Sequence, residues 1–371
     1  MDAATPPRVL VIGSECYPDT MEWHVVDALN RAGVPVKLFE CRAFYNAMPK
    51  PFGAALAKAT ALLLREPERL LERRLVQAVS EFAPSLVLVL LGSQLSPKTV
   101  ALLRTHTDSP IVCWCQDQLS TLGRQYMLGA GYDLVFVKDR YIQDLFSRMV
   151  RSTTFHYLPE ACNPRVHHPV TLSERDAVQY GCEIMIAGTL YYYRQDILSQ
   201  LANFDLKIWG GVPDWLQKKV ASYHTGRQVT GIEKCRAVAG ARICLNTLHF
   251  AEINGLNCRA FELAGCAAFQ LITSVPVLAE HFVPDQEIVT FSTIDELIEK
   301  VNYYRAHFDE AQSIARRGME RAVRDHTYEH RLEQIFASVW GPVRIPAPAP
   351  APVPVPVPVL VNPHTSMGVP Q

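Results

Sequence analysis

Short apolar runs alternate with helical segments along the first 160 residues. Runs such as "SLVLVLLG" are apolar throughout, which is expected of strands that are covered on both faces. Strands and helices in alternation predict βαβ crossovers, and therefore a doubly wound parallel sheet of the α/β class. The predicted strands are 8–13, 34–40, 85–92, 110–116, 134–139 and 153–159, and the predicted helices are 21–32, 53–65, 67–82, 96–106 and 140–148.

The same pattern begins again after "ACNPRVHHPV". A second α/β domain is therefore predicted, with the boundary near 162–172. We expect an N-terminal domain over 1–163, a C-terminal domain over 164–325, a last helix over 326–341, and a tail over 342–371. The predicted strands of the second domain are 182–188, 204–211, 241–248, 267–273 and 288–292, and its helices are 193–203, a segment that follows Asn257, 294–306 and 308–324.

The tail differs in composition from the rest of the chain. Residues 342–371 hold ten of the 26 prolines, including the repeat "PAPAPAPVPVPVPV". Such a run favours an extended polyproline II conformation and does not build a packed core. We expect a disordered Pro-rich tail, and docking of a partner on it is the alternative.

Charge and cysteine content exclude several classes of protein. The net charge is −1, so no general nucleic-acid-binding surface is expected. No secretory leader and no apolar run of about 18 residues is present, so no transmembrane segment is predicted. The ten cysteines contain no C-x-x-C pair and are interpreted as reduced thiols of a cytoplasmic protein. The pair His167-His168 is interpreted as part of a linker rather than as metal ligands, and no metal site is predicted.

Common cofactor and nucleophile motifs are absent. The chain has no G-x-x-x-x-G-K-[ST], G-x-S-x-G or H-E-x-x-H motif. The loop after the first strand, "GSECYPDT", has one glycine, so no standard dinucleotide site is expected there. No bound cofactor is predicted.

The segment "NGLNCRAFELAGC" carries two charges at the start of an apolar helix. If Asn257 caps the helix, Arg259 is its second residue and Glu262 its fifth, so a capping box does not explain Glu262. A cation is mildly unfavourable at a helix N-terminus, unless an anion binds there too. The free amides and Arg259 would bind a phosphate, Gly255 would allow close approach, and Glu262 would accept hydrogen bonds from ribose hydroxyls. An ion pair between Arg259 and Glu262 explains this segment equally well.

A second strand end supports the anion site. "MIAGTLYYYRQDIL" is a strand that ends at Gly188 and Thr189 and leads into a helix at Arg194. Ligands of open α/β sheets bind at the carboxyl ends of strands. The strand at 241–248 leads into the same region and brings His249 with it. The predicted binding residues are Gly188, Thr189, Arg194, His249, Asn254, Gly255, Leu256, Asn257, Arg259 and Glu262.

These residues, in this order, resemble the GT-B glycosyltransferases, and among them the CgeB-like (spore-maturation-protein-like) members of group 1. The resemblance is carried by "IMIAGTLYYYRQDIL", "DLKIWGGVPDW" and "ARICLNTLHFAEINGLNCRAFELAGCAAFQLI", with "LPEACNPRVHHP" resembling the passage between the domains. It covers about 1–340 and is most specific over 182–336.

The resemblance implies two Rossmann-like domains that face each other across a cleft, with a nucleotide-diphosphate sugar held mainly by the C-terminal one. It implies that the helix at 326–340 crosses back to the N-terminal domain. Group-1 enzymes commonly have two glutamates separated by seven residues. Glu262 matches the second, which binds ribose, whereas Asn254 stands at the first. Arg194 matches a cation that binds the diphosphate.

The expected function is therefore sugar transfer from a nucleotide-diphosphate sugar to an unidentified glycan, protein or small-molecule acceptor. Arg194 and Arg259 would stabilise the leaving diphosphate without a metal. Asp117, after the strand in "VCWCQDQ", is the candidate base, although it could equally cap the following loop. The alternatives are a non-catalytic sugar-nucleotide-binding scaffold and a sugar-nucleotide epimerase.

Overall fold

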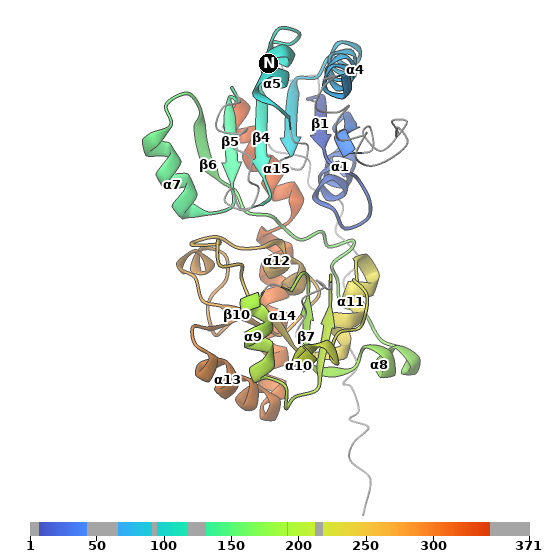
Figure 1. Cartoon of the computed structure of the whole chain (residues 1–371), viewed down its shortest axis with the longest axis vertical. Helices are drawn as coiled ribbons and strands as arrows, with labels where there is room; N and C mark the ends of the chain where they lie inside the picture. The colour runs from blue at the N-terminus through green and yellow to red at the C-terminus, as the bar shows by residue number, and fades with distance from the viewer. Residues whose placement is uncertain are drawn as a thin grey trace, which may run out of the picture.

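The apolar run that follows Arg8 forms a central strand of a parallel sheet. The computed structural model describes residues 7–42, 66–90, 95–117, 131–190, 192–211 and 218–341. Within these residues the chain forms two α/β units, one above the other in Figure 1. The helix predicted at 53–65 and the tail at 342–371 lie outside the described residues.

The first unit contains a six-stranded parallel sheet of order β2-β1-β3-β4-β5-β6. Side chains of β1 alternate between two cores: Val9 and Val11 pack with α1, whereas Leu10 and Ile12 pack with α4 and α5. Both faces of the sheet are covered, which explains the continuous apolar runs in the sequence. Its elements are β1 Val9–Gly13, α1 Met21–Arg31, β2 Val36–Glu40, α4 Glu66–Phe82, β3 Leu86–Leu90, α5 Pro97–Arg104, β4 Ile111–Cys115, β5 Leu134–Val137, α7 Arg140–Met149 and β6 Thr154–Tyr157.

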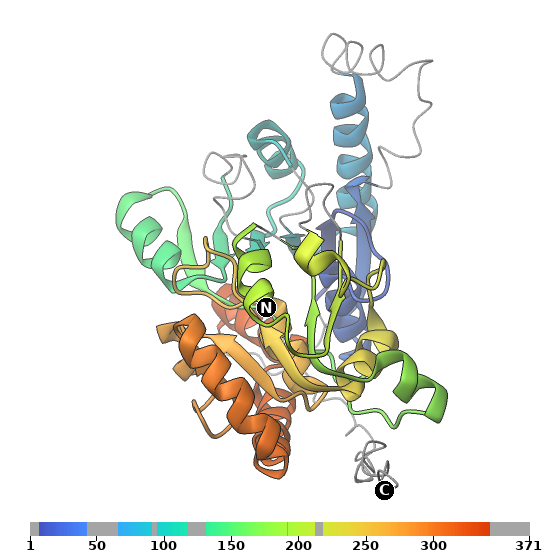
Figure 2. The same cartoon turned by 60° about the horizontal axis from the view of Figure 1, so that its bottom comes forward.

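The second unit contains a five-stranded parallel sheet of order β11-β10-β9-β7-β8. Figure 2 turns this unit toward the viewer, with its orange helices α13 and α14 beside the strands they cover. Its elements are α8 Glu174–Tyr180, β7 Cys182–Ala187, α9 Tyr192–Gln200, β8 Leu206–Trp209, α10 Lys218–Ala221, α11 Gly231–Gly240, β9 Ala241–Asn246, α12 Cys258–Gly265, β10 Gln270–Thr273, η3 Pro276–Glu280, β11 Val289–Phe291, α13 Ile294–Ala306 and α14 Phe308–Asp325.

The last helix, α15 (Tyr328–Trp340), returns to the first unit. Its residues Leu332, Ile335 and Phe336 are fully buried in the core that also contains α1 and β1. Arg31 of α1 and Glu329 of α15 form an ion pair of 2.9 Å. The chain therefore crosses the boundary between the units twice.

The two units meet through the loop that follows β5 and the loop that precedes α12. Asp139 and Gly255 form an antiparallel bridge, and Arg140 N donates to Asn254 O at 2.9 Å. Because both loops leave the carboxyl ends of parallel strands, those ends of the two sheets face each other (Figure 1). None of the ten cysteines forms a disulfide. Among the described helices, none has the length and apolar character needed to cross a bilayer.

The sequence did not predict α8 and α11. α8 has seven residues, and α11 ("GIEKCRAVAG") has glycine at both ends, where the helical pattern is weakest. Several predicted strands are also longer than the observed ones, because their last residues leave the sheet and enter the loops between the units. The strand predicted at 153–159, for example, ends at Tyr157.

Candidate functional site

Gly188 directly follows β7 and has a backbone conformation that favours glycine, with φ of +112°. A Cβ atom there would lie 2.4 Å from Nη1 of Arg259. That guanidinium donates to the carbonyl of Ala187, the last residue of the strand. The missing side chain at 188 therefore allows the Arg259 guanidinium to lie directly over the carboxyl end of β7.

Arg194 reaches the same strand ends from α9 and is 1% exposed. Its Nη1 donates to the carbonyl of Thr189, and its Nη2 donates to the carbonyl of Thr247 at 2.6 Å. This side chain therefore ties the end of β7 to the end of β9. Two guanidinium groups from different helices, both predicted to bind a diphosphate, lie at neighbouring strand ends of one sheet.

Two buried side chains beside Arg194 have polar atoms without a hydrogen-bond partner among the described residues. They are Gln195, through both atoms of its amide, and Thr247, through Oγ1. Gln195 is 0% exposed and Thr247 is 1% exposed. Buried polar atoms are almost always hydrogen-bonded, so these atoms keep the capacity to bond a water molecule or a polar ligand.

Asn257 caps α12, as the sequence predicts. Its Oδ1 accepts from Ala260 N at 3.1 Å, and its Nδ2 donates to Oδ1 of Asn246 at 2.9 Å. The cap is thus fixed to the last residue of β9. Arg259 and Glu262 are the second and fifth helical residues.

The loop before α12 contacts the first unit. Asn254 N donates to Oδ2 of Asp139 at 3.0 Å, and Oδ1 of Asn254 accepts from Val277 N at 2.8 Å. A Cβ at Gly255 would lie 2.8 Å from the carbonyl oxygen of Lys138, and Leu256 is fully buried. Close packing between the units therefore requires glycine at 255, which is a different reason from the phosphate approach expected from the sequence.

Glu262 does not pair with Arg259, so the helix ion pair considered above is not formed. Glu262 is 4% exposed, and its Oε2 accepts from Nζ of Lys234, on α11, at 2.9 Å. Burial alone would raise the pKa of Glu262, but Lys234 and His167 hold it below its ordinary value. Lys234 therefore favours the ionised form of Glu262.

Asp19, in the loop after β1, accepts from several donors at once. Its Oδ2 lies 2.6 Å from Nζ of Lys234 and accepts from Gly231 N at 2.9 Å. Its Oδ1 lies 2.8 Å from Nε2 of His167 and 3.4 Å from Nε2 of His24. We call Asp19, His24, His167, Lys234 and Glu262 the Asp19 cluster. His167 lies in the passage between the two units, where the sequence predicts it, and its side chain is fully buried.

Four residues of the Asp19 cluster have the ligand types of a metal site: one carboxylate or imidazole atom from each of Asp19, His24, His167 and Glu262 lies within 4.8 Å of the others. Nδ1 of His167 accepts from Asn163 N at 3.1 Å, so in the neutral ring the proton is on Nε2, which donates to Asp19. Lys234 already supplies a cation to both carboxylates. The His167 nitrogen that faces Asp19 thus carries its proton, and Lys234 occupies one oxygen of each carboxylate, so the four ligand atoms do not present lone pairs to one metal ion together.

A second buried charge cluster lies nearby. Nζ of Lys138 lies 2.9 Å from Oε1 of Glu252 and 3.7 Å from Oε2 of Glu160. Burial, with added repulsion from Asp117 and other carboxylates, raises the pKa of Glu160 to about 8. Asp117, the candidate base, is exposed at the end of β4.

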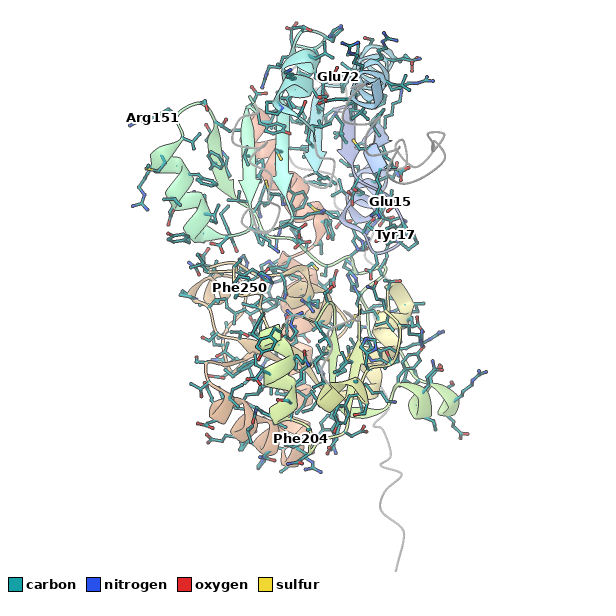
Figure 3. All side chains as sticks on the ribbon, viewed as in Figure 1. Glu15, Tyr17, Glu72, Arg151, Phe204 and Phe250 are labelled. Carbon is teal, nitrogen blue, oxygen red and sulfur yellow. The ribbon has the colours of Figure 1, made fainter. Side chains whose placement is uncertain are left out.

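The rim between the units carries exposed aromatic residues. Phe250, after β9, is 75% exposed, and Tyr17, after β1, is 54% exposed. Figure 3 shows them at the ends of the two units that face each other. His249, whose ring packs against Phe250 at a tilt, is half-buried, and its Nδ1 accepts from Ala251 N at 3.1 Å.

Sequence reasoning missed most of the residues that connect the units. Lys138 and Thr247 each stand one residue before the end of a predicted strand, 134–139 and 241–248, so their position near carboxyl strand ends was a usable signal. Lys234 lies on α11, which was not predicted. Asp19 and Gln195 carry no local signal.

Comparison with known proteins gives a family match and a fold match. Residues 194–337 match the model of a family described as glycosyl transferase-like. This segment contains Arg194, Lys234, Arg259 and Glu262. A comparison with curated proteins found no match.

Several solved structures share the fold over most of the chain. Sucrose-phosphate synthase from Thermosynechococcus elongatus has 13% identity and a TM-score of 0.60, covering 90% of this chain and 100% of that one. HepE from Anabaena, in complex with UDP and glucose, has 14% identity and a TM-score of 0.60, covering 90% and 99%. A glycosyltransferase from Rickettsia africae has 11% identity and a TM-score of 0.62, covering 90% and 98%. The fold is that of the GT-B glycosyltransferases.

Proposed function

We propose that this chain, with its two GT-B units, transfers a sugar from a nucleotide-diphosphate sugar to an acceptor, without a metal ion. We further propose that it is of the CgeB-like kind and works in the cytoplasm, where its ten free thiols would remain reduced. The observation that carries the proposal is the convergence of Arg194 and Arg259 on the carboxyl ends of β7 and β9, beside the unpartnered polar atoms of Gln195 and Thr247.

The diphosphate would bind at the start of α12. The first amides of a helix have no intrahelical partner, and the helix dipole favours an anion there. Arg259 is the second residue of this helix, and its guanidinium would exchange the Ala187 carbonyl for a phosphate oxygen. Glu262, one turn further along, would accept hydrogen bonds from the ribose.

Transfer requires stabilisation of the charge that develops on the leaving diphosphate. The acceptor oxygen forms a bond to the anomeric carbon as the bond from that carbon to the diphosphate oxygen breaks. Arg194, Arg259 and the helix amides would stabilise the departing nucleoside diphosphate, which takes the bonding electron pair. Asp117, at the end of β4 on the other unit, would accept the proton of the acceptor hydroxyl.

The comparisons support this proposal in two ways. The glycosyl transferase-like family model matches the segment that contains both arginines and Glu262. Among the structures that share the fold, HepE was solved with UDP-glucose. The acceptor is unidentified. Loops of the first unit, at 14–22, 43–53 and 117–131, would contact the acceptor. The last two lie largely outside the described residues, as does the tail that would recruit partners.

The test is to incubate the protein with a panel of nucleotide-diphosphate sugars and to measure thermal stabilisation and release of nucleoside diphosphate. We expect one donor to raise the melting temperature and to be turned over. Arg259→Met should weaken donor binding by about tenfold or more, because a charge-assisted hydrogen bond is lost. Lys300→Met, on α13, is the matched control, because Lys300 pairs with Glu296 four residues earlier, away from the site. Binding without turnover would favour a scaffold, and a lack of binding to every donor would reject both functions.

A further inference from the structure

Glu262 has one oxygen engaged and one available. Its Oε2 accepts from Lys234, whereas Oε1 accepts no hydrogen bond from a described residue and lies 4.0 Å from Nε2 of His167. The orientation of the carboxylate is therefore set by Lys234, and Oε1 keeps its capacity to accept from a hydroxyl group.

Lys234 is in turn held by the other unit. Its Nζ lies 2.6 Å from Oδ2 of Asp19, which belongs to the loop after β1 in the first sheet. The Lys234 and Asp19 side chains are only 10% and 2% exposed, so their attraction is weakly screened by solvent. Ammonium and carboxylates thus form a chain, Asp19–Lys234–Glu262, that crosses from one unit to the other.

Asp19 adopts a left-handed backbone conformation, which aspartate tolerates better than most non-glycine residues. Its φ is +78°, in the left-handed region that few non-glycine residues occupy. His167 and the Gly231 amide both donate to its carboxylate, so the strained loop is held by contacts from beyond the first sheet. These contacts fix the position of the carboxylate that holds Lys234.

We propose that Lys234 and Asp19 are positioning residues that hold Glu262 in place for the ribose of the nucleotide, so that the ribose site is completed across the boundary between the two units. This inference rests on the proposed function. Neither residue contacts the ribose: Asp19 fixes Lys234, and Lys234 fixes the carboxylate.

The inference predicts how strongly the wild-type protein and two variants, Lys234→Met and Asp19→Asn, prefer ribose to deoxyribose. The probes are UDP, ADP and GDP, each with its 2′-deoxy counterpart, and binding is measured by calorimetry. Wild-type protein should bind the ribonucleotide about tenfold more tightly or better, because a hydrogen bond to a charged group is lost with the 2′-hydroxyl. In Lys234→Met the ratio of the two dissociation constants, deoxynucleotide to ribonucleotide, should fall below about threefold. The affinity for the deoxynucleotide should change little.

Asp19→Asn tests the second link and remains informative if Lys234→Met does not fold. Asparagine keeps the shape and tolerates the left-handed conformation, but it removes the charge that holds Lys234. The ratio should fall here too, whereas Lys300→Met should keep the wild-type ratio. The inference is overturned if Lys234→Met or Asp19→Asn keeps the wild-type ratio, or if both nucleotides weaken equally. It is also overturned if wild-type protein binds both nucleotides equally, although the proposed function would then stand. If wild-type protein binds no nucleotide, the proposed function itself fails.

Discussion

Lys138 and Glu252 join the two units through a buried ion pair of 2.9 Å, between the end of β5 and the loop after β9. Their side chains are 7% and 4% exposed, so neither charge is well hydrated. Such a pair has a specific energetic property: removing one partner costs more than removing both, because the remaining charge stays buried.

Lys138→Met should lower the free energy of unfolding by about 3–5 kcal/mol, because it leaves the buried carboxylate of Glu252 without its cation. The double variant Lys138→Met/Glu252→Gln should recover part of that loss. Urea denaturation of the two single variants and the double variant measures the coupling. Additive effects of the two substitutions would contradict the pairing.

Glu160 should make the protein less stable at alkaline pH. Its pKa is about 8 in the folded protein, against an ordinary value of 4.5. The folded state therefore binds the proton more tightly than the unfolded state. This contribution to stability is present below about pH 4.5 and is lost as the pH rises to about 8, at roughly 1.4 kcal/mol per pH unit at most. Glu160→Gln should flatten this slope in denaturation curves taken at pH 5, 6, 7 and 8. An unchanged slope would show that the carboxyl titrates normally.

Two buried histidines should make the protein less stable at acid pH. Burial lowers the pKa of His281 to about 2 and, together with Arg331, that of His326 to about 4, against an ordinary value of 6.5. Both side chains are neutral in the folded protein. Their contribution to the free energy of unfolding is therefore fully present above pH 6.5 and is lost as the pH falls toward 4. His281→Gln should lessen the decrease in melting temperature between pH 7 and pH 4.5. His106, an exposed histidine, gives the matched control, His106→Gln, which should leave that decrease unchanged.

Gly255→Ala should destabilise the contact between the units. Its Cβ would lie 2.8 Å from the carbonyl of Lys138, a backbone atom that cannot move aside cheaply. We expect a loss of about 1–3 kcal/mol in the free energy of unfolding. Gly131→Ala is the control, because no atom lies within 4 Å of a Cβ built there, and it should change stability by less than about 0.5 kcal/mol. Equal effects of the two substitutions would contradict the close contact.

Local patterns in the sequence predicted the strands and the start of α12. Continuous apolar runs identify strands buried on both faces, and Asn257 is the cap of α12 because a side-chain acceptor at that place satisfies a helix amide. Both properties depend on neighbours within a few residues. The α/β class with two parallel sheets follows from them.

The partners of the charged residues could not be predicted in this way. Arg259 and Glu262 are three residues apart, yet they contact Ala187 and Lys234, which lie on other elements. His167 contacts Asp19, which is 148 residues away. Sequence spacing indicates which residues share a helix face, but only the tertiary fold determines which of two partners a long side chain reaches.

The return of α15 to the first unit has a consequence for folding during synthesis. Leu332, Ile335 and Phe336 belong to the same core as Val9 and Val11, so this core lacks part of its apolar packing until the residues near 340 have left the ribosome. The second unit, whose sheet is complete at Phe291, therefore has all its strands before the first unit has its last helix. Domains that are contiguous in sequence generally fold in order from the N-terminus. In this chain the N-terminal unit is the last to be completed, and a ribosome stalled before residue 328 would carry it with an apolar surface exposed to chaperones.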